Sequence, residues 1–234
     1  MSYDWVEDAK RRAAVEAVKN IRDGFIVGLG SGSTAAYAIE EIGRRVREEG
    51  LQVLGVPSSY QSLLLAAKFG IPTTTLYEHP LIDLTIDGAD QIDQNLNLIK
   101  GMGGALTREK IIAAASRCLI IVADERKLTD KLGVGQLLPV EILPFAEPLV
   151  KAKIREIGGK PYLRESKKNA PFITDNGNFI LDVDFGAIDD PLDLERKLKM
   201  IPGVVETGLF IGMAKSAYIG TRTSVKKIDV GERW

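Results

Sequence analysis

The chain has 234 residues, with 31 lysines and arginines against 32 aspartates and glutamates, so its formal net charge is −1. Hydrophobic residues make up 45% of the chain and charged residues 27%, which is typical of a globular protein and excludes a disordered, collagen-like or disulfide-rich chain. The near-zero net charge also argues against a protein dedicated to binding nucleic acid.

Helical and strand-like patterns alternate in the first half of the chain. Apolar residues at three- and four-residue spacing predict a helix over 4–21, which Gly24 ends. Short apolar runs predict strands at 25–29, 52–56, 71–76, 81–86 and 117–123, and helical spacing predicts helices at 34–47, 60–69 and 107–115. Apolar strands that alternate with helices favour an α/β fold, with a Rossmann-like parallel sheet flanked by helices.

The pattern changes after about Gly133, where prolines separate shorter segments. Asp-Asn-Gly-Asn at 175–178 predicts a hairpin turn between strands at 172–174 and 179–183, and helices are predicted at 147–157 and 192–200. We therefore predict a catalytic Rossmann-like domain over 1–135 and 207–234, and a small α+β, ferredoxin-like domain over 136–206. The segments 209–211 and 217–219 are expected to rejoin the first sheet.

The first candidate site is the sequence Gly-Leu-Gly-Ser-Gly-Ser-Thr at 28–34, between a predicted strand and a predicted helix. Glycines permit a tight turn with exposed amides, the amino end of a helix carries partial positive charge, and Ser31, Ser33 and Thr34 add hydroxyl donors. The third glycine of a dinucleotide fingerprint would fall at Ser33, and the spacing is not that of a Walker loop. We interpret the segment as a phosphate-binding loop; the alternative is a glycine-rich turn that only caps the helix.

The second candidate, Asp87-Gly88-Ala89-Asp90, directly follows the predicted strand 81–86. Ligands of an open α/β sheet bind at the carboxyl ends of its strands, so two carboxylates three residues apart can converge on one pocket. The alternative is an ordinary turn, because aspartate and glycine are favoured in loops.

The third candidate is the glycine-rich segment 100–110, which leads into a helix that Thr107 is expected to cap. Lys100 is a cation that can stabilise an oxyanion, and Glu109, in the first turn, is a carboxylate that can move a proton. The alternative for Glu109 is simple complementarity to the helix dipole. Lys127 follows another apolar strand and can meet a phosphate at the same sheet edge, with solvated charge as its alternative.

The sequence gives little indication of a metal site, a membrane span or a signal peptide. The chain has one cysteine and one histidine, too few for a Cys/His metal cage, so we expect no metal. Its apolar runs fall short of the roughly 20 residues that span a bilayer, and its amino end is charged where a signal peptide would be apolar. We expect a cytoplasmic protein.

Five segments occur in the order found in the ribose-5-phosphate isomerase A family, which the chain resembles over nearly its whole length. They are 28–34, Pro-Ser-Ser-Tyr-Gln-Ser at 57–62, Asp-Gly-Ala-Asp at 87–90, Lys-Gly-Met-Gly-Gly-Ala-Leu-Thr-Arg-Glu-Lys at 100–110, and Val-Val-Glu-Thr-Gly-Leu-Phe at 204–210. The pair at 87–90 and 100–110 is highly specific for that family. One departure is Met102, which stands where many relatives have glycine.

The resemblance implies an aldose–ketose isomerase that interconverts ribose 5-phosphate and ribulose 5-phosphate through an enediolate, without a metal or organic cofactor, in the non-oxidative pentose phosphate pathway. It implies that Glu109 is the general base, and Asp87 or Asp90 could help to open the furanose ring. A homodimer or homotetramer is also implied, with the small domain as the assembly surface. The implied substrate-binding residues are Lys10, Ser31, Gly32, Ser33, Thr34, Asp87, Gly88, Ala89, Asp90, Lys100, Gly101, Met102, Gly103 and Lys127.

Two other functions share some of these features. A sugar-phosphate hydrolase or amino-sugar-phosphate deaminase would bind similar ligands, but the Lys-Gly and Thr-Arg-Glu-Lys sequences of segment 100–110 argue against both. A sugar-phosphate sensor without catalysis, such as the effector domain of a transcription regulator, would not need Glu109, and we expect no helix-turn-helix extension.

Overall fold

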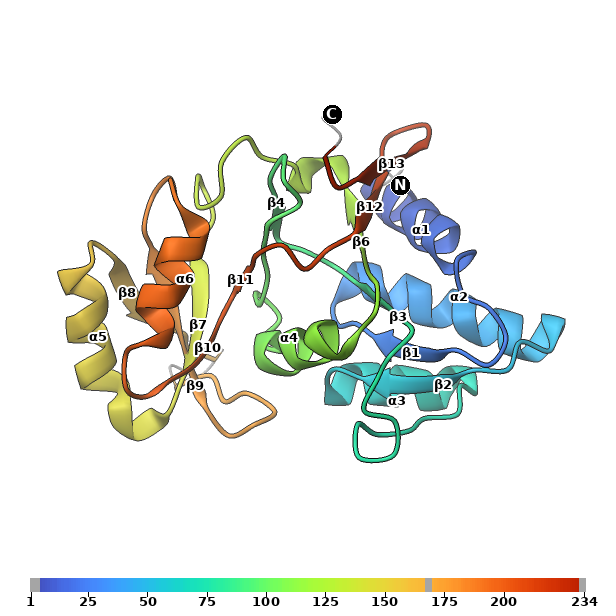
Figure 1. The fold of residues 1–234 in the computed structure, drawn as a ribbon, viewed down its shortest axis with the longest axis horizontal. Coiled ribbons are helices and arrows are strands. Elements are labelled where there is room, and N and C mark those ends of the chain that lie inside the picture. The colour runs from blue at the N-terminus through green and yellow to red at the C-terminus, as the bar shows by residue number, and fades with distance from the viewer. Residues whose placement is uncertain (1–4, 167–169, 232–234) are drawn as a thin grey trace.

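The computed structural model describes residues 5–166 and 170–231. Its largest sheet has six strands in the order β13-β12-β6-β3-β1-β2 (Figure 1). β13 runs antiparallel to β12 at one edge, and all other neighbours in this sheet are parallel. The strands are β1 (Ile26–Leu29), β2 (Leu54–Pro57), β3 (Leu84–Asp87), β6 (Leu119–Asp124), β12 (Ser216–Gly220) and β13 (Val225–Asp229).

Both faces of the six-stranded sheet are covered. On one face, α1 (Trp5–Val18), α2 (Ser33–Glu49) and α3 (Tyr60–Phe69) share a hydrophobic core with Val27 and Leu29 of β1. On the other face, α4 (Leu106–Ala115) packs together with a small antiparallel sheet in the order β11-β5-β4. The strands of that sheet are β4 (Gln91–Ile92), β5 (Leu98–Ile99) and β11 (Leu209–Phe210). Coverage on both faces explains why the parallel strands are apolar throughout.

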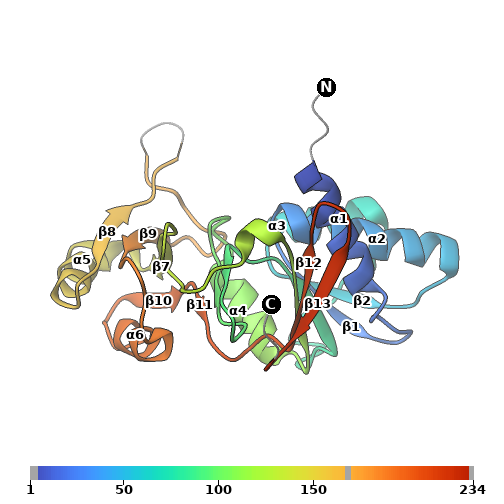
Figure 2. The ribbon, with the colours of Figure 1, turned by 90° about the horizontal axis from the view of Figure 1, so that it is seen from above.

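A second, four-stranded antiparallel sheet has the order β10-β7-β9-β8. Its elements follow one another as βαββαβ, the ferredoxin-like arrangement. They are β7 (Leu138–Ile142), α5 (Glu147–Glu156), β8 (Lys160–Leu163), β9 (Phe179–Asp184), α6 (Pro191–Lys199) and β10 (Val204–Thr207). Val150 of α5 and Leu198 of α6 pack in one core with Val140 and Val183, so both helices cover the same face. Figure 2 shows this unit beside the larger sheet, with α4 and β11 between them. The predicted fold class is confirmed.

Two predicted strands are wrong. In segment 71–76, Thr73 makes an isolated bridge to Gly55 and the chain then turns, with the amide of His79 donating to Thr75. Pro72 has no N–H for a longer ladder. Segment 172–174 does not form the hairpin strand, because β9 pairs with β8 and β7 instead. The predicted turn is nevertheless present, with the amide of Thr174 donating to Asn178 O at 2.9 Å.

The carboxyl-terminal strands were predicted in part. Segment 217–219 lies in β12 and rejoins the larger sheet, as expected. Residues 209–210 form β11 and pair with β5 instead, so the expectation that 209–211 rejoins the larger sheet is wrong. The predicted helix 4–21 corresponds to α1, and its first residue, Asp4, lies outside the described residues. No helix within residues 5–166 and 170–231 combines the length and hydrophobicity that crossing a bilayer requires.

Candidate active site

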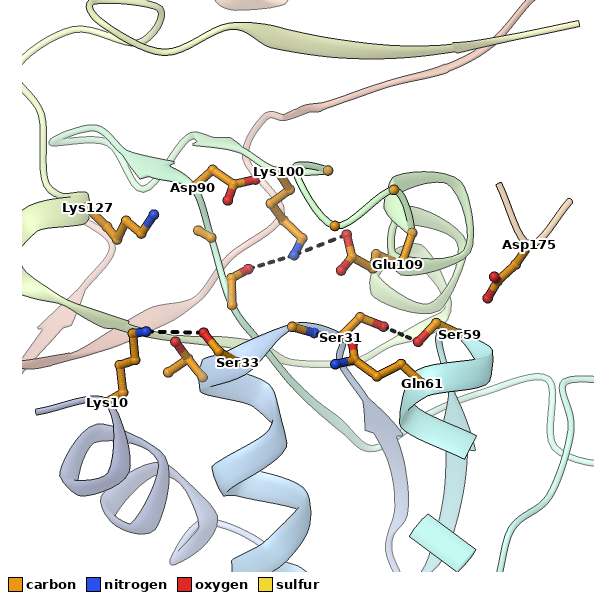
Figure 3. Close-up of a pocket in the computed structure, with 18 of the residues that line it drawn as sticks. Lys10, Ser31, Ser33, Ser59, Gln61, Asp90, Lys100, Glu109, Lys127 and Asp175 are labelled. Atoms are coloured by element: carbon orange, nitrogen blue, oxygen red, sulfur yellow. Dashed lines mark hydrogen bonds and ion pairs between the residues drawn. The ribbon is translucent and has the colours of Figure 1, made fainter. Parts of the chain in front are cut away.

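The strand order reverses beside β1, because the chain passes from β1 through α2 to β2 and then returns through α3 to β3 on the other side of β1. Ligands of doubly wound sheets bind at the carboxyl ends of the strands at such a reversal. A cavity of about 240 Å³ lies there (Figure 3). It is lined by the predicted residues Lys10, Ser31, Gly32, Ser33, Thr34, Gly88, Ala89, Asp90, Lys100, Gly101, Gly103, Glu109 and Lys127.

Asp87 joins the first two candidate loops. A Cβ added to Gly30 would lie 2.2 Å from Asp87 Oδ1, so only glycine lets the end of β1 approach this carboxylate so closely. Asp87 Oδ1 accepts from the amides of Ser31 at 3.1 Å and Gly88 at 2.7 Å, and Oδ2 lies 3.0 Å from Lys100 Nζ. Asp87 is 1% exposed and lies outside the cavity lining. It therefore supports the wall of the cavity from behind.

Lys100 and Glu109 form a buried ion pair in the cavity wall. Lys100 Nζ lies 3.4 Å from Glu109 Oε2 and donates to Gly88 O at 2.6 Å. Burial and the charge of Asp87 raise the pKa of Glu109 to about 8, although Lys100 opposes the shift. Burial disfavours the charge on Lys100, but the carboxylates of Asp87 and Glu109 outweigh it and raise the pKa of Lys100 above its usual value. Glu109 can therefore exchange a proton near neutral pH while Lys100 stays charged.

The start of α4 directs Glu109 toward Lys100 (Figure 3). The helix begins one residue earlier than predicted, after Ala105, and the amide of Glu109 donates to Ala105 O at 3.0 Å. Thr107 is therefore inside the helix, and the prediction that it caps the helix is wrong. Glu109 Oε2 is buried and accepts no hydrogen bond from the part of the chain that the structure describes. Its nearest cation is the Lys100 ammonium group, at 3.4 Å.

The opposite end of the cavity is suited to an anion. α2 begins at Ser33 after Gly32, whose φ of 92° a residue with a side chain rarely adopts. The amides of the first helical turn have no partner within the helix, and the helix dipole makes this end positive. Lys10 Nζ donates to Ser33 Oγ at 3.2 Å. In Figure 3, Lys10, Ser33 and Lys127 lie toward the left and Glu109 toward the right.

Met102, a predicted substrate-binding residue, does not line the cavity. Its side chain lies outside the cavity lining and is 46% exposed, while its amide donates to Asp90 Oδ2 at 3.0 Å. The carboxylate of Asp90, which does line the cavity, thus also fixes the second glycine loop.

Several lining residues were missed by the sequence analysis. Ser59 and Gln61 lie in segment 57–62, whose place in the family pattern was the available signal. Ser59 Oγ lies 2.5 Å from Ser31 Oγ, and Gln61 Oε1 accepts from the amide of Gly32 at 3.0 Å. The other missed residues are Gly104, Ala105, Arg126, Phe172 and Asp175. Within the described ranges, no group of three or more His, Cys, Asp and Glu side chains is arranged to hold a metal ion.

Comparisons with known proteins match this chain to one family over most of its length. A family model described as ribose 5-phosphate isomerase A (phosphoriboisomerase A) matches residues 54–224. The curated ribose-5-phosphate isomerase A of Methanosarcina acetivorans is 56% identical over 221 residues, which cover 94% of this chain and 93% of that protein. The solved structure of ribose 5-phosphate isomerase A from Methanocaldococcus jannaschii has a TM-score of 0.92 at 44% identity, covering 95% of this chain and 99% of that one. A solved D-ribose-5-phosphate isomerase in complex with phospho-erythronic acid has a TM-score of 0.93 at 46% identity, covering 96% and 99%.

Proposed function

The chain belongs to the ribose-5-phosphate isomerase A family, and we propose that it interconverts ribose 5-phosphate and ribulose 5-phosphate with Glu109 as the general base. It is an isomerase, as its relatives are. The observation that carries the proposal is the buried pair of Lys100 and Glu109 in the same cavity as the amino end of α2. A relative of 46% identity binds phospho-erythronic acid, a phosphorylated sugar acid whose planar carboxylate resembles an enediolate.

The reaction moves a proton between neighbouring sugar carbons. Glu109 removes the proton from C2 of the open-chain aldehyde, the C–H electrons form a C1–C2 double bond, and negative charge develops on O1. The O2 proton then passes to O1, and Glu109 returns its proton to C1, which leaves a ketone at C2. The charge of Lys100 stabilises the enediolate oxygens. The substrate undergoes no net oxidation or reduction, so the step needs no external oxidant or reductant.

Acid–base catalysis is worth about 10²–10⁴-fold, so the sugar must also be held in line with the base. We assign this to the amino end of α2, with Lys10 and Lys127, which would hold the phosphate group at the end of the cavity away from Glu109. Asp90 lines the cavity and is therefore our candidate for opening the furanose ring. Asp87, which lies behind the wall, is assigned to orienting Lys100.

Substitution of Glu109 by glutamine tests the proposal directly, because glutamine keeps the shape of the side chain and cannot accept a proton. We expect the rate of ribulose 5-phosphate formation to fall by about 10²–10⁴-fold, while phospho-erythronic acid still binds. The assay is run without added cofactor and with a chelator present. A variant that keeps the unsubstituted rate would remove Glu109 from the mechanism.

We also propose that residues 136–206 form a separate small domain, that 1–135 and 207–234 form the catalytic domain, and that the chain assembles through the small domain into a homodimer or homotetramer. The separate core around Val140 and Val183 supports the division. Light scattering during size-exclusion chromatography measures the assembly, and a monomer at assay concentration would contradict it.

A further inference from the structure

We propose that Glu141 is a positioning residue for proton transfer. It lies on β7 of the four-stranded sheet, and it holds the first turn of α4, which carries Glu109, against the 174–178 turn, which carries Asp175. The proposal rests on the role that we propose for Glu109. Glu141 does not line the cavity. Its proposed role is to set the position of the Glu109 carboxylate.

Glu141 is fully buried and accepts four hydrogen bonds. Its Oε2 accepts from Thr107 Oγ1 at 2.5 Å. Its Oε1 accepts from Thr174 Oγ1 at 2.9 Å, Asn176 Nδ2 at 3.0 Å and Asn178 Nδ2 at 2.8 Å. One carboxylate oxygen thus holds the helix, and the other holds the turn.

A carboxylate suits this contact, because both of its oxygens accept hydrogen bonds. All four donors are uncharged, and two of them are amide NH₂ groups that need an acceptor. A glutamine can keep its carbonyl oxygen toward Asn176 and Asn178 only if its NH₂ group faces Thr107. The Thr107 hydroxyl would then accept instead of donate, so the charge-assisted contact to α4 would become a weaker, neutral one. Burying an ionised carboxylate against neutral donors alone is expensive in solvation free energy, so a hydrophobic residue would serve better if stability were its only role.

The network continues from α4 to the start of α3. Thr107 lies two residues before Glu109 in α4. Arg108, between them, donates to Asn176 Oδ1 at 2.7 Å and to Asp175 O at 2.9 Å. Asp175 Oδ2 in turn accepts from the amide at the start of α3 at 2.8 Å, next to the residues that face the anion end. Glu141 therefore fixes the base relative to the site proposed for phosphate.

The test substitutes Glu141 by glutamine and, separately, Thr107 by valine, which removes only the contact to α4. The matched control is Val183→Ala, because Val183 is fully buried in the same sheet but faces the helices away from this network. Rates are measured well below the unfolding temperature of every variant. Thr107→Val keeps the proposal testable if Glu141→Gln does not fold.

We expect Thr107→Val to lower kcat by about tenfold or more, within the roughly 10²-fold that a displacement of 1 Å costs, and to change KM by less than about threefold. Glu141→Gln, which can keep a neutral hydrogen bond to Thr107, should lower kcat less but in the same direction. Loss of the contact should also move Glu109 away from Lys100, so the acid limb of the kcat/KM profile should shift to higher pH. Val183→Ala should lower the unfolding temperature and leave kcat and the profile unchanged.

Two results would overturn the positioning role: kcat within about twofold of the unsubstituted chain in both test variants, or an equal loss of kcat in Val183→Ala. Glu109→Gln, assayed in parallel, separates this from failure of the proposed function. If Glu109→Gln is inactive while Glu141→Gln and Thr107→Val are both fully active, only the positioning role fails. If Glu109→Gln is active, the proposed function fails first.

Discussion

Lys100 Nζ lies 3.4 Å from Glu109 Oε2, and only 3% of Lys100 and 5% of Glu109 is exposed. The same ammonium group lies closer, at 3.0 Å, to the carboxylate of Asp87. Two buried carboxylates thus share one cation, and Glu109 is the one that faces the cavity. Burial and the neighbouring charge of Asp87 raise the pKa of Glu109, so it can take up a proton near neutral pH, which is the property that a general base requires.

The first prediction concerns the pH dependence of catalysis. Glu109 must be deprotonated to act, and burial and the charge of Asp87 raise its pKa to about 8. The value of kcat/KM, which reports the free enzyme, should therefore rise with pH and level off above about pH 8. The substrate phosphate titrates near pH 6, so its effect on the kcat/KM profile falls at lower pH than that of Glu109. A profile that is flat between about pH 7 and pH 9 would contradict this assignment.

The second prediction links the same shift to stability. The folded chain holds the Glu109 proton up to a pKa of about 8, against a usual value of 4.5. The unfolded chain therefore releases this proton first, and stability is lost as the pH rises from 4.5 to 8. Glu109→Gln carries no charge, so it should unfold at a higher temperature than the parent at about pH 9, by roughly 2–4 °C for each kcal/mol gained. Calorimetry should show the difference shrinking at about pH 5.5. A difference independent of pH would be evidence against the raised pKa.

Much of the fold was predictable because its signals are local. The glycine loop before α2 and the helical spacing within α2 lie next to each other in sequence, as do the strand and turn that end at Asp87. The strand predicted at 71–76 is wrong because an apolar, threonine-rich run is typical of a strand when it is read in isolation. Only its tertiary position beside β2 limits it to one bridge. Strands of two residues, such as β4 and β5, are too short to show any period.

Some residues of the candidate site could likewise be predicted from a local motif, and others depend on tertiary packing. Lys100 and Glu109 belong to one segment, so a short motif contains both, and their residue types alone suggest acid–base chemistry. Phe172 and Asp175 reach the cavity from the segment between β8 and β9, far along the chain, and no local pattern marks them as site residues. Glu141 offered one weak signal, a single charge inside an apolar strand, but its partners are determined by tertiary packing.

The third prediction separates ring opening from proton transfer. Asp90 lines the cavity, and if it opens the furanose ring, Asp90→Asn should slow net conversion of ribose 5-phosphate by about tenfold or more. Ribulose 5-phosphate has no furanose ring, because its 5-hydroxyl carries the phosphate. Exchange of its C1 hydrogen with D₂O through the enediolate, followed by NMR, should therefore continue in Asp90→Asn. Equal loss of conversion and exchange would reject the ring-opening role.

Asp87→Asn is the comparison for that experiment and makes a distinct prediction. Asp87 is buried and ion-paired with Lys100, and breaking a buried pair typically costs about 3–5 kcal/mol of stability. Because Lys100 loses its closest partner, conversion and C1 exchange should fall together, and the unfolding temperature should fall as well. A selective loss of conversion with exchange intact would instead assign ring opening to Asp87.

The last prediction tests the anion end through a residue that the sequence analysis missed. Gln61 Oε1 accepts from the amide of Gly32, directly before the first turn of α2, and Gln61 lines the cavity. Gln61→Glu places a negative charge beside the proposed phosphate site, so KM should rise by about tenfold, equivalent to ~1.4 kcal/mol, with kcat little changed. Gln61→Ala removes the contact without adding charge and should raise KM less. Added salt should weaken the effect of Gln61→Glu, because it screens exposed charges. Equal effects of the two substitutions would mean that the contact matters and the charge does not, and would place the phosphate away from this end of α2.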